Sequence, residues 1–171
     1  ITADKIKVIT DGFDEEVFKS LKKRDIYPDK ITITFLGTYY NEFENDINNF
    51  CRVVSEIDPS IEIIFIGRGV EVVRNMNLPN TTCILNLPRR KALSFGSGST
   101  YLFLTMPSFA KWTPTKTYDY LKLDRPILAL VPKDSDPAKI INKANSGYIL
   151  PYEISKMKKD LINLQILNLS F

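Results

Sequence analysis

The sequence contains no histidine. That absence excludes histidine-based general acid–base catalysis, Ser-His-Asp triads, Cys-His dyads and histidine-ligated metal sites within this chain. Cysteine is scarce as well, because only Cys51 and Cys83 occur, far apart and in no metal-binding or redox motif. We therefore expect two reduced, buried thiols in a cytosolic protein.

Positive charge and long apolar runs are also limited. The 171 residues include 23 Lys and Arg against 20 Asp and Glu, a net charge of +3, and the basic residues are dispersed. We expect no nucleic-acid partner, because this charge is too weak for a nucleic-acid-binding surface. The tightest basic cluster, residues 89–91, is typical of a solvated helix start. No run of about 18 apolar residues occurs, so we expect no transmembrane segment in this chain.

What the sequence does have is an alternation of strand-like and helix-like apolar patterns, in a globular composition of 44% hydrophobic and 25% charged residues. Strand patterns cover residues 31–36, 61–66, 82–85, 100–106, 127–131 and 147–150, with a further short one at 5–10. Helical patterns cover residues 14–23, 41–57, about 70–76, 88–95, 114–123, 136–144 and 153–167. Strands that are apolar on both faces and alternate with helices predict a parallel sheet covered on both sides.

The predicted fold class is therefore α/β, a Rossmann-like doubly wound parallel sheet of about six strands with helices on both faces. Residues 1–30 are more polar and less regular, and we expect them to form an inter-domain entry segment and a first helix. Residues 31–171 form the Rossmann-like domain. The chain begins at Ile1 rather than Met, which favours a fragment of a longer protein.

Two glycine-containing loops follow the predicted strands, at the edge where doubly wound sheets bind ligands. Gly37 ends the first strand, where a glycine permits either close backbone approach to a phosphate or simply a tight turn. Gly67-Arg68-Gly69 follows the second strand and is half of a dinucleotide fingerprint, with Val72 in place of the third glycine. Arg68 could reach an anion or remain solvated. No GxxxxGK[ST] motif occurs, which excludes P-loop NTPases.

Residues 96–99, Gly-Ser-Gly-Ser, precede a predicted strand rather than follow one. That is the wrong end of a strand for a phosphate-binding loop, so we interpret them as a flexible turn.

The most informative stretch is residues 112–124, WTPTKTYDYLKLD. It predicts a helix with Thr113 as its cap and Pro114 in its first turn. The following residues bring two hydroxyls and an ammonium to the positive end of that helix, from Thr115, Lys116 and Thr117. Free N–H groups with these side chains suit a diphosphate.

Asp119 lies one turn beyond Lys116, where a carboxylate could accept hydrogen bonds from ribose hydroxyls. The alternative is an exposed helix in which Lys116 and Asp119 form an i,i+3 ion pair. The residues alone leave both interpretations open.

The stretch 114–150, PTKTYDYLKLDRPILALVPKDSDPAKIINKANSGYIL, resembles the signature region of the group-1 glycosyltransferases, glycosyltransferase family 4. In that family the pattern is Pro-x-Lys, an acidic residue three positions on, Tyr-Leu and a Pro-Ile-Leu-Ala strand. ITDGFD at 9–14, ITITFLGTYY at 31–40 and IEIIFIGRG at 61–69 resemble the family's entry segment and its first two strands. The likeness covers essentially the whole chain in the right order.

The resemblance implies the C-terminal, donor-binding half of a GT-B enzyme, which holds a nucleoside-diphosphate sugar. Gly37 would then lie beside the diphosphate, with the helix start at residues 115–117 binding its phosphates. Asp119 would hold the ribose, and Leu87 would border the base. We expect no cofactor and no metal, since GT-B enzymes typically need no bound metal.

This chain departs from the resembled family in its charges. Many members have an arginine after the glycine of the first loop, where this chain has Thr38. Lys116, Arg68 or a domain outside this chain would have to supply that charge. Asp119 replaces the more usual glutamate, and the first acid of the family's paired-Glu motif is missing near Lys111.

The function implied is transfer of a sugar from a nucleoside diphosphate to an acceptor hydroxyl, in surface polysaccharide synthesis and with retention. Lys116 would stabilise the charge of the departing diphosphate. The acceptor, a glycan or lipid-linked glycan, would bind an N-terminal domain absent from this chain, so we expect the chain alone to be inactive. We expect a cytoplasmic protein, with a peripheral position at the inner membrane face for the full-length protein. The alternatives are a non-catalytic nucleotide-binding or interaction domain of the same fold, and a sugar-nucleotide epimerase, which the absence of a Ser-Gly-Gly motif disfavours.

Overall fold

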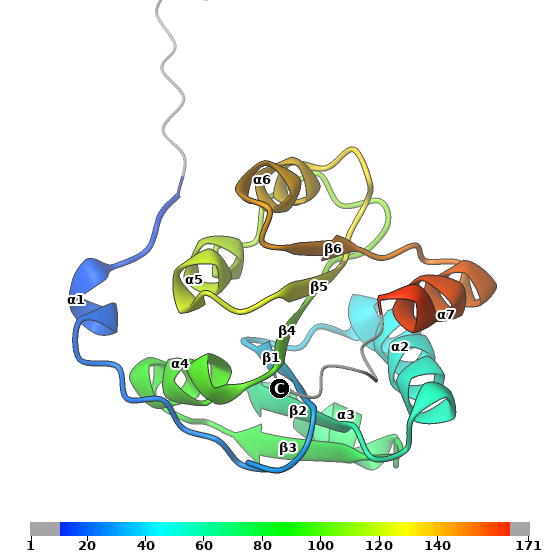
Figure 1. Ribbon diagram of the computed structural model, residues 1–171, viewed down its shortest axis with the longest axis horizontal. Coiled ribbons are helices and arrows are strands. Elements are labelled where there is room, and N and C mark those ends of the chain that lie inside the picture. The colour runs from blue at the N-terminus through cyan, green and yellow to red at the C-terminus, as the bar shows by residue number, and fades with distance from the viewer. Residues whose placement is uncertain (1–10, 165–171) are drawn as a thin grey trace, which may run out of the picture.

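A computed structural model of the chain describes residues 11–164. In this part of the chain, six parallel strands form one sheet in the order β3-β2-β1-β4-β5-β6 (Figure 1). Their bounds are β1 Thr32–Leu36, β2 Glu62–Gly67, β3 Thr81–Leu85, β4 Tyr101–Thr105, β5 Ile127–Leu130 and β6 Gly147–Ile149. This is the doubly wound order, with its switch point between β1 and β4. The predicted fold class is confirmed; the pattern at residues 5–10 and the rest of the entry segment before residue 11 lie outside the described residues.

Helices connect the strands and cover both faces of the sheet. Their bounds are α1 Glu15–Phe18, η2 Asn41–Phe43, α2 Glu44–Ile57, α3 Glu71–Asn75, α4 Arg89–Gly98, α5 Lys116–Leu123, α6 Asp136–Ala144 and α7 Ile154–Asn163. In Figure 1, α4, α5 and α6 lie on one side of the sheet, and α2, α3 and α7 lie on the other. No helix within residues 11–164 is long and apolar enough to span a membrane.

Each face of the sheet has its own hydrophobic core. The first lies under α2, α3 and α7 and includes Phe50 and Phe103, whose rings stack with centroids 3.9 Å apart. The second lies under α4, α5 and α6 and includes the fully buried Tyr120 together with Leu123. Burial of these two side chains fixes α5, the helix with the predicted phosphate-binding residues, against the sheet.

Two predicted elements differ most from the structure. The helix expected over residues 14–23 is limited to Glu15–Phe18. None of its residues is fully buried, and Val17, Phe18 and Leu21 pack only partly buried against the second core, which is too little to stabilise a longer helix. Residues 96–99, interpreted as a flexible turn, form the last turn and cap of α4. Gly98 there faces Arg24 so closely that a Cβ would lie 2.0 Å from the Arg24 carbonyl oxygen. These glycines serve close packing rather than flexibility.

Candidate functional site

A cavity of about 330 Å³ opens at the carboxyl ends of β1, β2 and β3, under the first turns of α4 and α5. It lies beside the switch point, where doubly wound sheets bind ligands. Six of the eight predicted site residues line it: Gly37, Thr38, Arg68, Leu87, Lys116 and Asp119. The structure therefore brings together residues from four separate segments of the sequence.

Two glycine turns form one wall of this cavity. The Gly37 N–H donates to the Ile66 carbonyl oxygen at 2.9 Å, which holds the turn after β1 against the turn after β2. Gly37 and Gly67 have φ values of +129° and +152°, a region that residues with a Cβ rarely adopt. Backbone, rather than side chains, is thus presented to the cavity at this wall.

Lys116 is the first residue of α5, and its amine points over the Gly37 turn. A Cβ on Gly37 would lie 3.3 Å from Lys116 Nζ, and Nζ lies 3.9 Å from the centroid of the Phe35 ring. Nζ is buried and has no hydrogen-bond partner among residues 11–164. Burial away from water lowers the pKa of Lys116 to about 7. An anion in the cavity would supply the partner that this amine lacks.

Asp119 lies one turn further along α5 and is paired with Arg89, at the start of α4. Arg89 Nη2 donates to Asp119 Oδ1 at 2.7 Å. Burial raises the pKa of Asp119, and the nearby guanidinium partly offsets that effect. The expected alternative, an i,i+3 ion pair between Lys116 and Asp119, is not formed.

The sequence pattern does not single out Arg89, because residues 89–91 are typical of a solvated helix start. Its side chain is half exposed, yet it lines the cavity and contacts the Asp119 carboxylate. The contact joins residues 30 positions apart on two different helices, and no local spacing signals it.

The two predicted threonines lie outside the cavity lining. Thr115 is exposed at the N-cap of α5, and its hydroxyl donates to Asp11 Oδ2 at 3.1 Å. Thr117 is buried, and its hydroxyl has no partner within the described part of the chain. The helix also begins two residues later than predicted. A tight turn, in which Thr117 N–H donates to the Pro114 carbonyl, precedes it.

Tyr120 is a second residue that the sequence analysis missed. Strands β1 and β4 pair only at Ile33–Tyr101 and Thr34–Leu102. Beyond these pairs the Tyr120 hydroxyl bridges the strands: it accepts from the Leu36 N–H at 2.8 Å and donates to the Phe103 carbonyl oxygen at 3.2 Å. The hydroxyl thus fixes α5, with Lys116 and Asp119, to the switch point.

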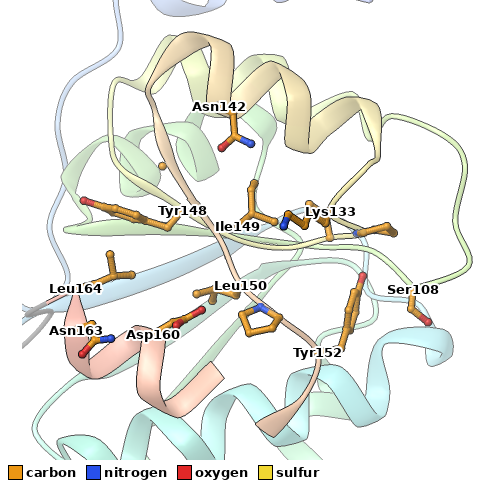
Figure 2. Close-up of a pocket in the computed structure, with 14 residues that line it drawn as sticks. Ser108, Lys133, Asn142, Tyr148, Ile149, Leu150, Tyr152, Asp160, Asn163 and Leu164 are labelled. Carbon is orange, nitrogen blue, oxygen red and sulfur yellow. The ribbon is translucent and has the colours of Figure 1, made fainter. Parts of the chain in front are cut away.

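A larger cavity, of about 710 Å³, lies elsewhere, along β6 between α6 and α7 (Figure 2). None of the predicted site residues lines it. Figure 2 shows the Lys133 side chain near one end and Asp160 and Asn163 toward the other. With one cation and one carboxylate in its lining, this larger cavity lacks the converging positive charge that a diphosphate requires. Within residues 11–164, no group of three potential metal-ligating side chains occurs in either cavity or elsewhere.

No protein-family model and no curated protein matches this sequence. Solved structures do match. AviGT4, a glycosyltransferase involved in avilamycin A biosynthesis, aligns with a TM-score of 0.65 at 12% identity, over 96% of this chain and 49% of that one. The fold is that of a GT-B Rossmann-like domain.

Two further matches have the same fold. A putative UDP-N-acetylglucosamine 2-epimerase from Listeria monocytogenes aligns with a TM-score of 0.57 at 12% identity, over 94% of this chain and 41% of that one. The S. aureus protein MnaA, solved with UDP, aligns with a TM-score of 0.58 at 12% identity, over 83% of this chain and 38% of that one. This chain therefore spans less than half the length of each of these three proteins.

Proposed function

We propose that the 330 Å³ cavity binds the nucleoside-diphosphate sugar of a glycosyltransferase, and that the chain is the C-terminal, donor-binding half of a two-domain GT-B enzyme. The observation that carries this proposal is the buried, unpartnered Lys116 amine over the Gly37 turn, in the same cavity as the Asp119 carboxylate. A diphosphate would meet the amine and the Gly37 backbone. Its ribose would meet Asp119, and its base would lie toward Leu87.

The reaction requires a sugar to leave its diphosphate. The acceptor hydroxyl oxygen forms a bond to the anomeric carbon, and the bond from that carbon to the diphosphate oxygen breaks. The electron pair stays on the diphosphate, which also receives the hydroxyl proton. Negative charge grows on the diphosphate as the bond breaks, and Lys116 with the N-terminus of α5 would stabilise it.

Two of the matched structures support the proposal. One is a glycosyltransferase, and the other was solved with UDP. The finer features rest on the resemblance to group-1 glycosyltransferases: retention, surface polysaccharide synthesis, a glycan acceptor on another domain, no metal, and work at the cytoplasmic face of a membrane. An epimerase acting on a nucleotide sugar is the second candidate, because one matched structure is such an enzyme.

The test is ligand-detected NMR with UDP, GDP, ADP and CMP on the wild type and three variants. We expect selective binding of one nucleotide, lost in Lys116→Ala and in Asp119→Ala. Lys122→Ala is the matched control, because Lys122 lies on the same helix but pairs with the exposed Glu15 at 3.1 Å. Binding of none of the four nucleotides by the wild type would contradict the donor-site proposal. Incubating the bound nucleotide's sugar conjugates with the two-domain enzyme separates the two candidates: isomerisation of the sugar identifies an epimerase, and transfer to an acceptor identifies a glycosyltransferase.

A further inference from the structure

The candidate donor cavity has an uneven distribution of positive charge. The turn after β1, where Thr38 stands, carries no cation. The cavity's basic side chains are instead those of Arg68, Arg89 and Lys116. Lys116 offers a single amine, whereas a nucleoside diphosphate carries at least two negative charges near neutral pH. A second cation close to Lys116 is therefore needed for charge balance at the phosphates.

Arg89 is placed to supply it. Its side chain is half exposed, in contrast to the buried Lys116 amine. Its only hydrogen bond among residues 11–164 is the one from Nη2 to Asp119 Oδ1, which leaves its other N–H groups available. A guanidinium binds phosphate oxygens through two parallel hydrogen bonds, a geometry that an ammonium cannot make.

Asp119 would have different hydrogen-bond donors in the empty cavity and in one that holds a nucleotide. In the structure Asp119 Oδ1 accepts from Arg89. If a ribose binds as proposed, its hydroxyls compete with Arg89 for the acceptor sites of a carboxylate that is only 12% exposed. A ribose that wins this competition frees Arg89 as phosphates enter the cavity that it lines.

We propose that Arg89 is a diphosphate-binding residue, held on Asp119 in the empty cavity and transferred to the phosphates when the ribose takes the carboxylate. This inference rests on the proposed function, because it requires a nucleotide in the cavity. Arg89, at the start of α4, would thus supply the positive charge that is missing from the turn after β1. The competing explanation is that Arg89 only orients Asp119, which predicts a different pattern of losses.

The test compares a nucleoside diphosphate with its own nucleoside, using isothermal titration calorimetry on the 171-residue chain. The probes are UDP with uridine, GDP with guanosine and ADP with adenosine. Arg89→Gln should weaken the diphosphate by about tenfold or more, the value of a charge-assisted hydrogen bond. It should not weaken binding of the nucleoside, since the carboxylate then faces no competitor for the ribose.

Arg90→Gln is the matched control, because Arg90 is the next residue and bonds to Ser20 rather than to the cavity. It should bind both probes like the wild type. Equal affinity of Arg89→Gln and wild type for the diphosphate would overturn the inference. Equal losses for diphosphate and nucleoside would also overturn it, in favour of an orienting role. A wild type that binds none of the diphosphates would overturn the proposed function itself.

Inorganic pyrophosphate gives a second measurement that does not involve ribose. Removing Arg89 also leaves the Asp119 charge unopposed, which alone would repel phosphates. The measurement is therefore made in Asp119→Asn, where that charge is absent. Adding Arg89→Gln to this variant should still weaken pyrophosphate by about tenfold if the guanidinium binds phosphate directly. No further loss would assign the effect to Asp119 alone and overturn the inference.

Discussion

The backbone of Gly67 approaches that of Gly37 so closely that a Cβ on Gly67 would lie 1.8 Å from the Gly37 carbonyl oxygen. No rotation of a side chain relieves such a contact, because both partners are backbone or Cβ atoms. The turns after β1 and β2 must separate to admit any other residue. The shape of the cavity wall therefore depends on this glycine.

We expect Gly67→Ala to lower the free energy of unfolding by well over 1 kcal/mol, since it combines this clash with a φ of +152°. Urea denaturation followed by circular dichroism measures it. Gly12→Ala is the control, because a Cβ there meets nothing within 4 Å. It should change stability by no more than about 0.5 kcal/mol. Similar stability of the two variants would contradict the close approach.

Tyr120→Phe should remove the bridge between β1 and β4. The substitution leaves the buried Leu36 N–H without its acceptor, and we expect a loss of about 1–3 kcal/mol in the free energy of unfolding. Tyr118→Phe on the same helix is the control, since its side chain is only partly buried. Nucleotide affinity should also fall in Tyr120→Phe, because α5 is then held less firmly. A stability equal to that of Tyr118→Phe would show that the bridge contributes nothing.

The buried Lys116 amine should make stability depend on pH. Its pKa is about 7 in the folded protein and 10.5 ordinarily, so between these values the unfolded chain binds a proton that the folded protein does not. Stability contributed by this residue therefore rises with pH over that range, by at most about 1.4 kcal/mol per pH unit. In urea denaturation, we expect the free energy of unfolding of the wild type to increase relative to that of Lys116→Met between pH 7 and pH 9. A difference between the two proteins that does not change with pH, or that changes in the opposite direction, would mean that the amine remains solvated.

The same amine should couple nucleotide binding to proton uptake. At pH 8 it is mostly neutral in the empty cavity, and a diphosphate beside it favours the charged form. Calorimetry in HEPES and in Tris should show uptake approaching about one proton per nucleotide. Lys116→Arg keeps a permanent charge and should bind with no uptake. Uptake of the same size in both proteins would assign the proton to another group.

The fold could be predicted from the sequence because each strand is apolar on both faces and each helix has an apolar stripe. Gly37, Lys116 and Asp119 could be singled out because their local spacing places them at the ends of these elements. Boundaries shifted where packing decided them, as for α1 and for the turn before Lys116. Arg89 and Tyr120 could not be found in this way. Their contacts with Asp119 and Leu36 span 30 and 84 residues, and only the folded chain brings these partners together.

Folding strips water from the Lys116 amine before any ligand arrives. An anion entering the cavity displaces no hydration shell from this side chain, because that cost was met when the chain folded. The empty domain is correspondingly less stable than one with an apolar residue at this position. A bound diphosphate would restore that stability, so occupancy should raise the melting temperature more than affinity for the ribose and base alone implies. Burying this amine thus lowers the stability of the empty domain, and the same burial leaves the amine already dehydrated when an anion binds.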